Sequence, residues 1–380
     1  MWLIVSILVL SFLIFFHELG HFLVARLFGV KVLVFSIGFG KKILTKRVNG
    51  TEYAISAIPL GGYVQMKGQD DLNPLARNED ADSYTTKSPL QKICILFAGS
   101  GANLLLAFLL YIYIGLAGIT TLLPVVGESM ENSPAQLAGL KEGDKIVRID
   151  NKNIKIWRDI ADYVSQKKEP INISFLRGNE LHEITLTPQV RDSKNIFGEN
   201  IKQSFIGVKA KGEIGLVRYG WSEIIPFALN ETAYAGKMIL LSVQKLITGI
   251  VPTSELGGPI AIVQIISNAT QSGLVALFSI TALISINLGL LNLFPIPALD
   301  GGHIIFTLYE WITRKPLSEK VLYRLIIFGW ALLLSLMALG IYNDIARIAT
   351  NSNDEKIQEI QPSGGENGSE KNTRKSNKTN

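Results

Sequence analysis

Long apolar runs without charge divide the chain, and their lengths predict membrane-spanning helices. Residues 1–16 read MWLIVSILVLSFLIFF, and residues 93–127, 256–299 and 325–343 likewise contain no Asp, Glu, Lys or Arg. A helix that crosses a bilayer needs about 20 predominantly apolar residues. We therefore expect a membrane α-helical bundle of about four transmembrane helices, at roughly 1–23, 93–118, 273–299 and 322–343.

The segment after the first span has a different pattern. Residues 32–37 and 53–58 are short β-branched and aromatic runs, and Asn49-Gly50 between them is a strong hairpin signal. We expect a membrane-associated β-hairpin here. Its edge strand could bind an extended peptide segment by β-addition, or the hairpin could be purely structural.

A compact α/β module is expected in the long segment that follows the second span. Residues 133–140 and 156–166 read as helices, and residues 145–150 and 171–176 as strands. Further on, 239–247 reads as an interfacial amphipathic helix, and Glu231, Lys237 and Lys245 argue against a fifth span. The expected units are the first two spans with the hairpin (1–118), the module (119–205), a juxtamembrane amphipathic region (206–270), spans three and four (271–349) and a disordered polar tail (350–380).

Composition and charge agree with this organisation. The hydrophobic fraction is 48% and the mean hydropathy +0.28, values that fit an integral membrane protein. The first run lacks the basic residues and cleavage site of a signal peptide, so we expect it to be retained. Basic residues concentrate in 26–92 and in 314–320, which places both loops in the cytoplasm and the module outside. The net charge of +5 is spread over loops and tail and does not indicate nucleic-acid binding.

Candidate chemistry lies where the first apolar run ends. His17-Glu18-Leu19-Gly20-His21 places two imidazoles four residues apart, on one face of a helix, where they can share a metal ion. Glu18 between them could accept a proton from a metal-bound water. Such a short pattern also arises by accident on core helices. However, the chain has four histidines and two of them are here, and ionisable groups in a span by default mark function.

A zinc hydrolase usually has three protein ligands, so a third is required. Asp300 is the best candidate, because it ends the longest charge-free stretch of the chain, beside two prolines and a Gly-Gly pair that break the helix. The alternative is an aspartate that caps a helix at the membrane surface. His303 could also reach a metal, but we expect it to support the site or to be solvated.

These segments together resemble the site-2 protease family of intramembrane zinc metalloproteases, in particular the regulator-of-sigma-E proteases that carry an external PDZ module. The resemblance extends to about residue 345. It rests on HELGH (17–21), FSIGFGKK (35–42), IPLGGYVQM (58–66), FAGSGANLLLAF (97–108), ENSPAQLAGLKEGDKIVRID (131–150) and SINLGLLNLFPIPALDGGH (285–303).

The resemblance implies roles for particular residues. His17, His21 and Asp300 would bind Zn²⁺, and Glu18 would be the general base. Four further residues would contact the substrate: Asn103, Asn292, Gly61 and Gly62. Two features depart from the family pattern, namely Ser100 where Pro is usual and space for a single PDZ module.

The expected function is therefore intramembrane proteolysis. The substrates would be single-span membrane proteins, such as a trimmed anti-sigma factor or remnant signal peptides, cleaved by a monomer in the inner membrane with its PDZ domain on the periplasmic side. Two alternatives stay open. One is a catalytically silent PDZ scaffold, and the other is a zinc transporter or sensor, although neither needs a base between the ligands.

Overall fold

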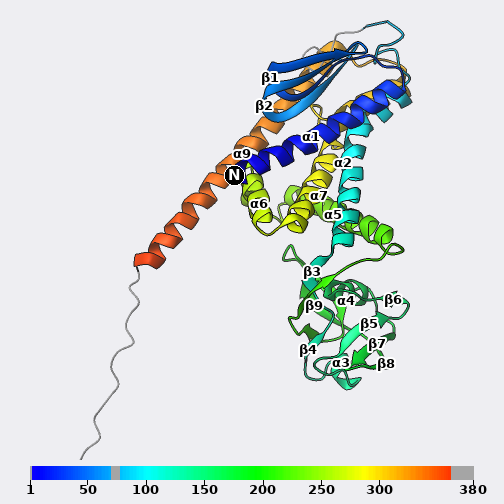
Figure 1. Cartoon of the computed structure of the whole chain (residues 1–380), viewed down its shortest axis with the longest axis vertical. Helices are drawn as coiled ribbons and strands as arrows, with labels where there is room; N and C mark the ends of the chain where they lie inside the picture. The colour runs from blue at the N-terminus through cyan, green and yellow to red at the C-terminus, as the bar shows by residue number, and fades with distance from the viewer. Residues whose placement is uncertain (1, 70–77, 361–380) are drawn as a thin grey trace, which may run out of the picture.

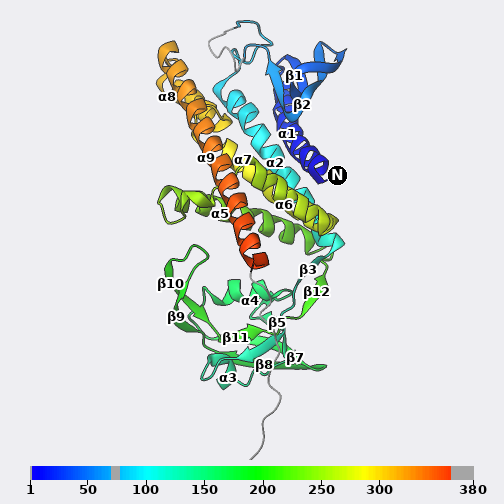
Figure 2. The same cartoon turned by 90° about the vertical axis from the view of Figure 1, so that its left-hand side faces the viewer.

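The computed structural model describes residues 2–69 and 78–360. Within these residues, four helices are long and apolar enough to cross a membrane, as the sequence predicted. A β-sheet region lies at one end of the helices and the inserted module at the other (Figures 1 and 2). The four helices are α1 (Trp2–Leu27), α2 (Pro89–Ala117), α7 (Leu274–Asn292) and α9 (Glu319–Ile360, with Glu319–Thr350 as the apolar part).

Small residues let the first helices pack closely. A Cβ on Gly20 of α1 would lie 2.2 Å from the carbonyl oxygen of Ala98 in α2, and a Cβ on Gly289 of α7 would lie 3.0 Å from that of Ser100. Such close backbone approach is typical of helix packing in membranes, where apolar burial by itself gives no driving force. The α2 helix passes through Gly99-Ser100 without a break, so Ser100 in place of proline leaves it regular.

The third span is shorter than predicted. The range 273–299 was expected to be one helix, but α7 ends at Asn292 and α8 (Asp300–Thr313) begins only after an irregular segment. Pro295 and Pro297 lie in that segment, and proline lacks the N–H that a helix interior requires. The break places the first residue of α8 within the bundle.

Three more elements complete the helical part. Helix α5 (Ile224–Ile247) lies across the module-side end of the bundle, and α6 (Pro259–Gln271) packs against α1 and α7 (Figures 1 and 2). A one-turn 3₁₀ helix (Thr253–Glu255) lies between them. Helix α9 is held to the start of α6 by the Asp344 carboxylate, which accepts hydrogen bonds from the backbone N–H groups of Gly258, Ile260 and Ala261.

The hairpin is larger than the two short strands predicted. Strands β1 (Val32–Val48) and β2 (Thr51–Met66) are joined at Asn49 and Gly50, whose φ angles of 50° and 82° are those of the predicted two-residue turn. Both strands bend, so that Val34 pairs with Glu52 on one side and with Gln65 on the other. The result is a sheet of four rows in the order 42–48, 51–56, 32–37 and 62–66, with 62–66 at one edge.

The module is a small α/β unit that extends beyond the predicted boundary at 205. Its main sheet has the order β6-β5-β7-β8 around a core that includes Ile146, Ile149, Ile173 and Phe175. Strand β11 pairs with β4, and β12 with β3, so the folded unit runs from 119 to 217. Its elements are β3 (Ile119–Leu122), β4 (Val126–Ser129), α3 (Pro134–Leu137), β5 (Lys145–Ile149), β6 (Lys152–Asn153), α4 (Trp157–Val164), β7 (Ile171–Arg177), β8 (Glu180–Leu186), β9 (Gln189–Lys194), β10 (Asn200–Phe205), β11 (Val208–Ala210) and β12 (Ile214–Val217).

Ion pairs fasten the module to α5. Lys155, two residues before α4, pairs with Glu223, which directly precedes α5, and Arg158 in the first turn of α4 pairs with Glu231. Glu199 pairs with Lys245 at the other end of α5. Two of the charges that argued against a fifth span, on residues 231 and 245, therefore bind the module. At the C-terminus, the predicted tail is helical up to Ile360, and residues 361–380 lie outside the described residues.

Candidate metal centre

Three side chains that could bind a metal converge inside the bundle. Helix α1 supplies His17 and His21, and the start of α8 supplies Asp300. The two Nε2 atoms lie 3.2 Å apart, and Asp300 Oδ2 lies 3.2 Å from Nε2 of His17 and 3.3 Å from that of His21. Both histidines are buried. The N-cap residue of α8 is Leu299, and Asp300 Oδ2 faces the two imidazoles instead, which disfavours the capping alternative for this residue.

The spacing of these atoms fits zinc. Zinc is bound by His nitrogen and carboxylate oxygen at about 2.0–2.2 Å, so two ligands at a tetrahedral angle lie about 3.3–3.5 Å apart. Moreover, Asp300 Oδ2 is buried, and although both Nε2 atoms lie within 3.3 Å of it, neither makes a hydrogen bond to it. A buried carboxylate oxygen without a hydrogen bond is costly unless a cation satisfies it. Together, the three side chains can hold one ion and leave a fourth position free.

One face of α2 supports the two histidines. Ile95, Gly99 and Asn103 follow one another at intervals of four residues and therefore lie on the same side of the helix. His21 Nδ1 lies 2.8 Å from the Ile95 carbonyl oxygen. This carbonyl can only accept, so the hydrogen is on Nδ1 and the Nε2 lone pair is free for a metal. A Cβ on Gly99 would lie 2.2 Å from His21 Nε2, so the imidazole occupies the space of a side chain there.

The two asparagines meet opposite nitrogens of His17. The amide nitrogen of Asn103 lies 3.2 Å from Nδ1, and that of Asn292 lies 3.3 Å from Nε2. Asn103 is fully buried, which leaves it no surface for a substrate, whereas Asn292 at the end of α7 is half-buried beside the metal-binding atoms.

Glu18 faces the sheet. It is half-buried, and a Cβ built on Gly62 would lie 3.5 Å from its Cγ. Gly62 belongs to the edge row 62–66, which pairs with 32–37 and with no other strand among the described residues. Gly61 has φ +141°, and a Cβ there would collide with the ring of Phe39. Gly62 thus lies beside Glu18 in the edge row, and Gly61 leaves room for the ring of Phe39.

The sequence missed two supports of the site, namely Gly99 and the Ile95 carbonyl. Gly99 could have been found, because it lies four residues before Asn103 and therefore on the same face of the helix. Nothing in the sequence marks the Ile95 carbonyl. His303 does not belong to the cluster of metal-binding side chains in the described part of the chain.

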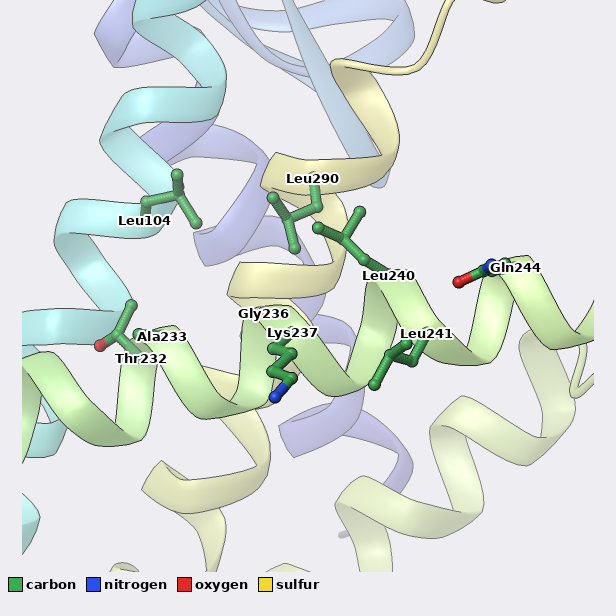
Figure 3. Close-up of a pocket in the computed structure, with 9 residues that line it drawn as sticks. All are labelled: Leu104, Thr232, Ala233, Gly236, Lys237, Leu240, Leu241, Gln244 and Leu290. Atoms are coloured by element: carbon green, nitrogen blue, oxygen red, sulfur yellow. The ribbon is translucent and has the colours of Figure 1, made fainter. Parts of the chain in front are cut away.

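An apolar groove lies among the helices α2, α5 and α7. It has a volume of about 530 Å³, and Leu104, Leu240 and Leu290 gather there (Figure 3). Leu104 follows Asn103 directly, and Leu290 precedes Asn292 by two residues. A second hollow of about 240 Å³ shares Leu240 and reaches Phe294, so the groove runs along α5 toward the break before α8.

The fold and the site define a class, namely a helical membrane protein with a His-His-Asp metal centre and an adjacent carboxylate. Comparison with known proteins identifies the family. Residues 5–336 match the model of peptidase family M50, the site-2 protease family, and the chain belongs to this family. It is a multi-pass membrane protein and a zinc metalloprotease by family, and its cofactor is Zn²⁺.

Relatives agree over almost their whole length. A protein of Campylobacter jejuni named as a zinc metalloprotease is 47% identical, with 90% of this chain and 93% of the relative covered. Another from Helicobacter pylori is 41% identical, with 91% of this chain and 99% of the relative covered. A solved PDZ domain of an SdrC-like protein from Listeria monocytogenes, 21% identical, covers 23% of this chain and 85% of that domain at a TM-score of 0.18, which is too low to assign the fold of the module.

Proposed function

We propose that this zinc metalloprotease cleaves transmembrane segments of single-span membrane proteins. The observation that carries the proposal is the position of the metal-binding triad, which lies on apolar helices and is completed at a helix break within the bundle. Irregular backbone at membrane depth is tolerated where it is buried in protein or lines a water-filled cavity. The scissile bond would therefore be in a segment that itself lies in the bilayer.

Residues around the triad supply the chemistry. Bound Zn²⁺ would provide an acidified water and a Lewis acid for the scissile carbonyl. Glu18, adjacent in sequence to His17, would take a proton from the attacking water and return it to the leaving amine. The half-buried Asn292 donates its amide N–H to the carbonyl oxygen as negative charge develops there.

The edge row 62–66 is suited to hold the substrate. A helical segment has its peptide groups in internal hydrogen bonds, so it must unwind before attack. An extended segment can add to a free sheet edge through backbone hydrogen bonds, and this row passes beside Glu18 with two glycines at its start. We propose that the backbone of this row, which begins at Gly61 and Gly62, contacts the substrate there.

The remaining parts suggest how a substrate is selected. The groove along α5 would receive an apolar segment on its way to the centre, and the module, as a PDZ domain on the periplasmic side of the inner membrane, would admit only proteins whose external part has been trimmed. Anti-sigma factors and remnant signal peptides have this form. We propose that the enzyme works as a monomer.

A reporter assay tests the proposal. A single-span reporter would be incubated with zinc-loaded wild type, with Glu18→Gln and with the matched control Glu52→Gln, whose carboxylate pairs with Lys42 in the sheet. We expect cleavage by wild type and control, and a loss of about 10²–10⁴-fold in Glu18→Gln. Equal cleavage by all three would contradict the role of Glu18. Absence of cleavage by zinc-loaded wild type would favour a scaffold, and zinc flux into proteoliposomes a transporter.

A further inference from the structure

The two ring nitrogens of His17 have different surroundings. Nε2 faces His21 and Asp300 at 3.2 Å each, as a zinc ligand should. Nδ1 points the other way, to the carboxamide of Asn103, whose nitrogen is 3.2 Å away. Because Asn103 is fully buried, this contact lies behind the ligand and away from any substrate.

The chemistry of the ligand determines what Nδ1 requires. A neutral imidazole carries a single N–H, so when Nε2 binds a metal the hydrogen is on Nδ1. That N–H then needs an acceptor. The Oδ1 atom of Asn103 is buried and has no hydrogen-bond partner in the described part of the chain. A half-turn of the carboxamide exchanges its nitrogen and oxygen and brings this acceptor to Nδ1.

We propose that Asn103 is a positioning residue of the zinc centre. In the zinc-loaded protein its carboxamide oxygen accepts the hydrogen bond from Nδ1–H of His17, which fixes the tautomer and the orientation of the ring and leaves the Nε2 lone pair for the metal. The inference rests on the proposed zinc ligands and changes the role of Asn103, which the family resemblance had assigned to the substrate.

Helix α7 holds Asn103 in place for this task. Ser285 donates a hydrogen bond to the backbone carbonyl of Asn103 at 2.8 Å, and a Cβ on Gly289 would lie 3.3 Å from the Asn103 Cβ. The asparagine is therefore clamped between α7 and the histidine. The same helix ends at Asn292, beside the other nitrogen of the ring.

Each histidine thus has a partner at its Nδ1 atom, but the two partners differ chemically. His21 donates to the main-chain carbonyl of Ile95, whereas His17 depends on a side chain. Partners of this kind usually change metal affinity about 10–100-fold when they are removed. A side-chain support can be removed by substitution, so the contribution to His17 is measurable.

The test is the zinc dissociation constant of the purified full-length protein, measured by competition with a chromophoric chelator. Asn103→Leu is similar in size but has no acceptor, and we expect its zinc affinity to fall by about 10–100-fold. Asn103→Asp keeps an acceptor and cannot donate, so we expect it to bind zinc at least as tightly as wild type does. Asn268→Leu, the same substitution at an exposed position of α6, is the matched control and should bind zinc normally.

Each outcome decides the inference. Unchanged affinity in Asn103→Leu would overturn it, and so would equally weak binding by the Leu and Asp variants, because the acceptor would then be irrelevant. If the melting curve of Asn103→Leu shows that it does not fold, Asn103→Ala replaces it with the same expected loss. Wild type that binds zinc and shows the expected pattern but cleaves no reporter would refute the protease proposal and leave the role of Asn103 intact.

Discussion

Gly99 of α2 and His21 of α1 are so close that the imidazole fills the place of the missing side chain, with Nε2 2.2 Å from where a Cβ would be. We expect Gly99→Ala to displace His21 and to abolish stoichiometric zinc binding. Gly101→Ala, two residues away, should bind zinc like wild type, because its Cβ would meet only the ring of Phe97 at 3.4 Å. Zinc content per polypeptide would be measured beside the melting temperature of each variant. Full zinc occupancy in Gly99→Ala would refute the close packing.

Asn292 should matter to turnover and not to zinc binding. It is half-buried at the end of α7, and its amide nitrogen lies 3.3 Å from Nε2 of His17, on the open side of the centre. We expect Asn292→Leu to lower kcat by about 10²-fold or more, as the removal of an oxyanion donor does, with KM little changed. Steady-state cleavage of the reporter would measure both constants. A rise in KM at unchanged kcat would show that Asn292 only binds substrate.

The pair Arg158–Glu231 should hold the module to α5. Arg158 of α4 is partly covered, Glu231 is 17% exposed, and removal of one charge leaves the other without its partner. We expect Glu231→Gln to speed amide hydrogen exchange in α4 and α5, which corresponds to a decrease of about 1–3 kcal/mol in the free energy of local opening. The swap Arg158→Glu with Glu231→Arg should restore part of the protection. Glu128→Gln breaks the exposed pair with Lys209 and should have little effect.

Asp144 should make the stability of the module depend on pH in the acid range. Burial raises the pKa of its carboxyl. The hydrogen bonds from Arg177 and from the Lys141 N–H, together with the charge of Arg177, lower the pKa by a larger amount, so it lies below its usual value. The resulting stabilisation is complete above about pH 4 and is lost as pH falls through the folded pKa.

We therefore expect Asp144→Asn to raise hydrogen exchange of β5 and β7 at neutral pH, equivalent to about 1–3 kcal/mol, and its difference from wild type to shrink below pH 4. Exchange would be followed by mass spectrometry in the full-length protein. Asp192→Asn, an exposed substitution in the same module, is the control. A difference that stays constant through the acid range would contradict the role of the charge.

The sequence predicted the features that depend on local pattern. Four apolar runs, the Asn49-Gly50 turn and the HELGH motif each carry their signal in consecutive residues, and the structure has helices, a turn or two converging imidazoles at each. Asp300 was also predictable, because a carboxylate after a long apolar stretch has few explanations other than function.

Features that depend on packing between distant segments could not be read in the same way. The second pairing of Val34 with Gln65 needs both strands to bend, and no single residue indicates it. The module's last strands lie beyond its predicted end, since their partners are at its beginning. The position of Asn103 behind His17 follows from how α2 faces α1, which a family motif does not reveal.

The order of the ligands along the chain determines when the enzyme can first act. His17, Glu18 and His21 are made at the start of translation, whereas Asp300 follows only after the module and α7 are complete. At about 5–20 residues per second, a growing chain spends many seconds in the membrane with two imidazoles and no third ligand. With the proposed ligand set, a nascent polypeptide that has not reached α8 has no complete metal site, so proteolytic competence would require synthesis to have reached Asp300.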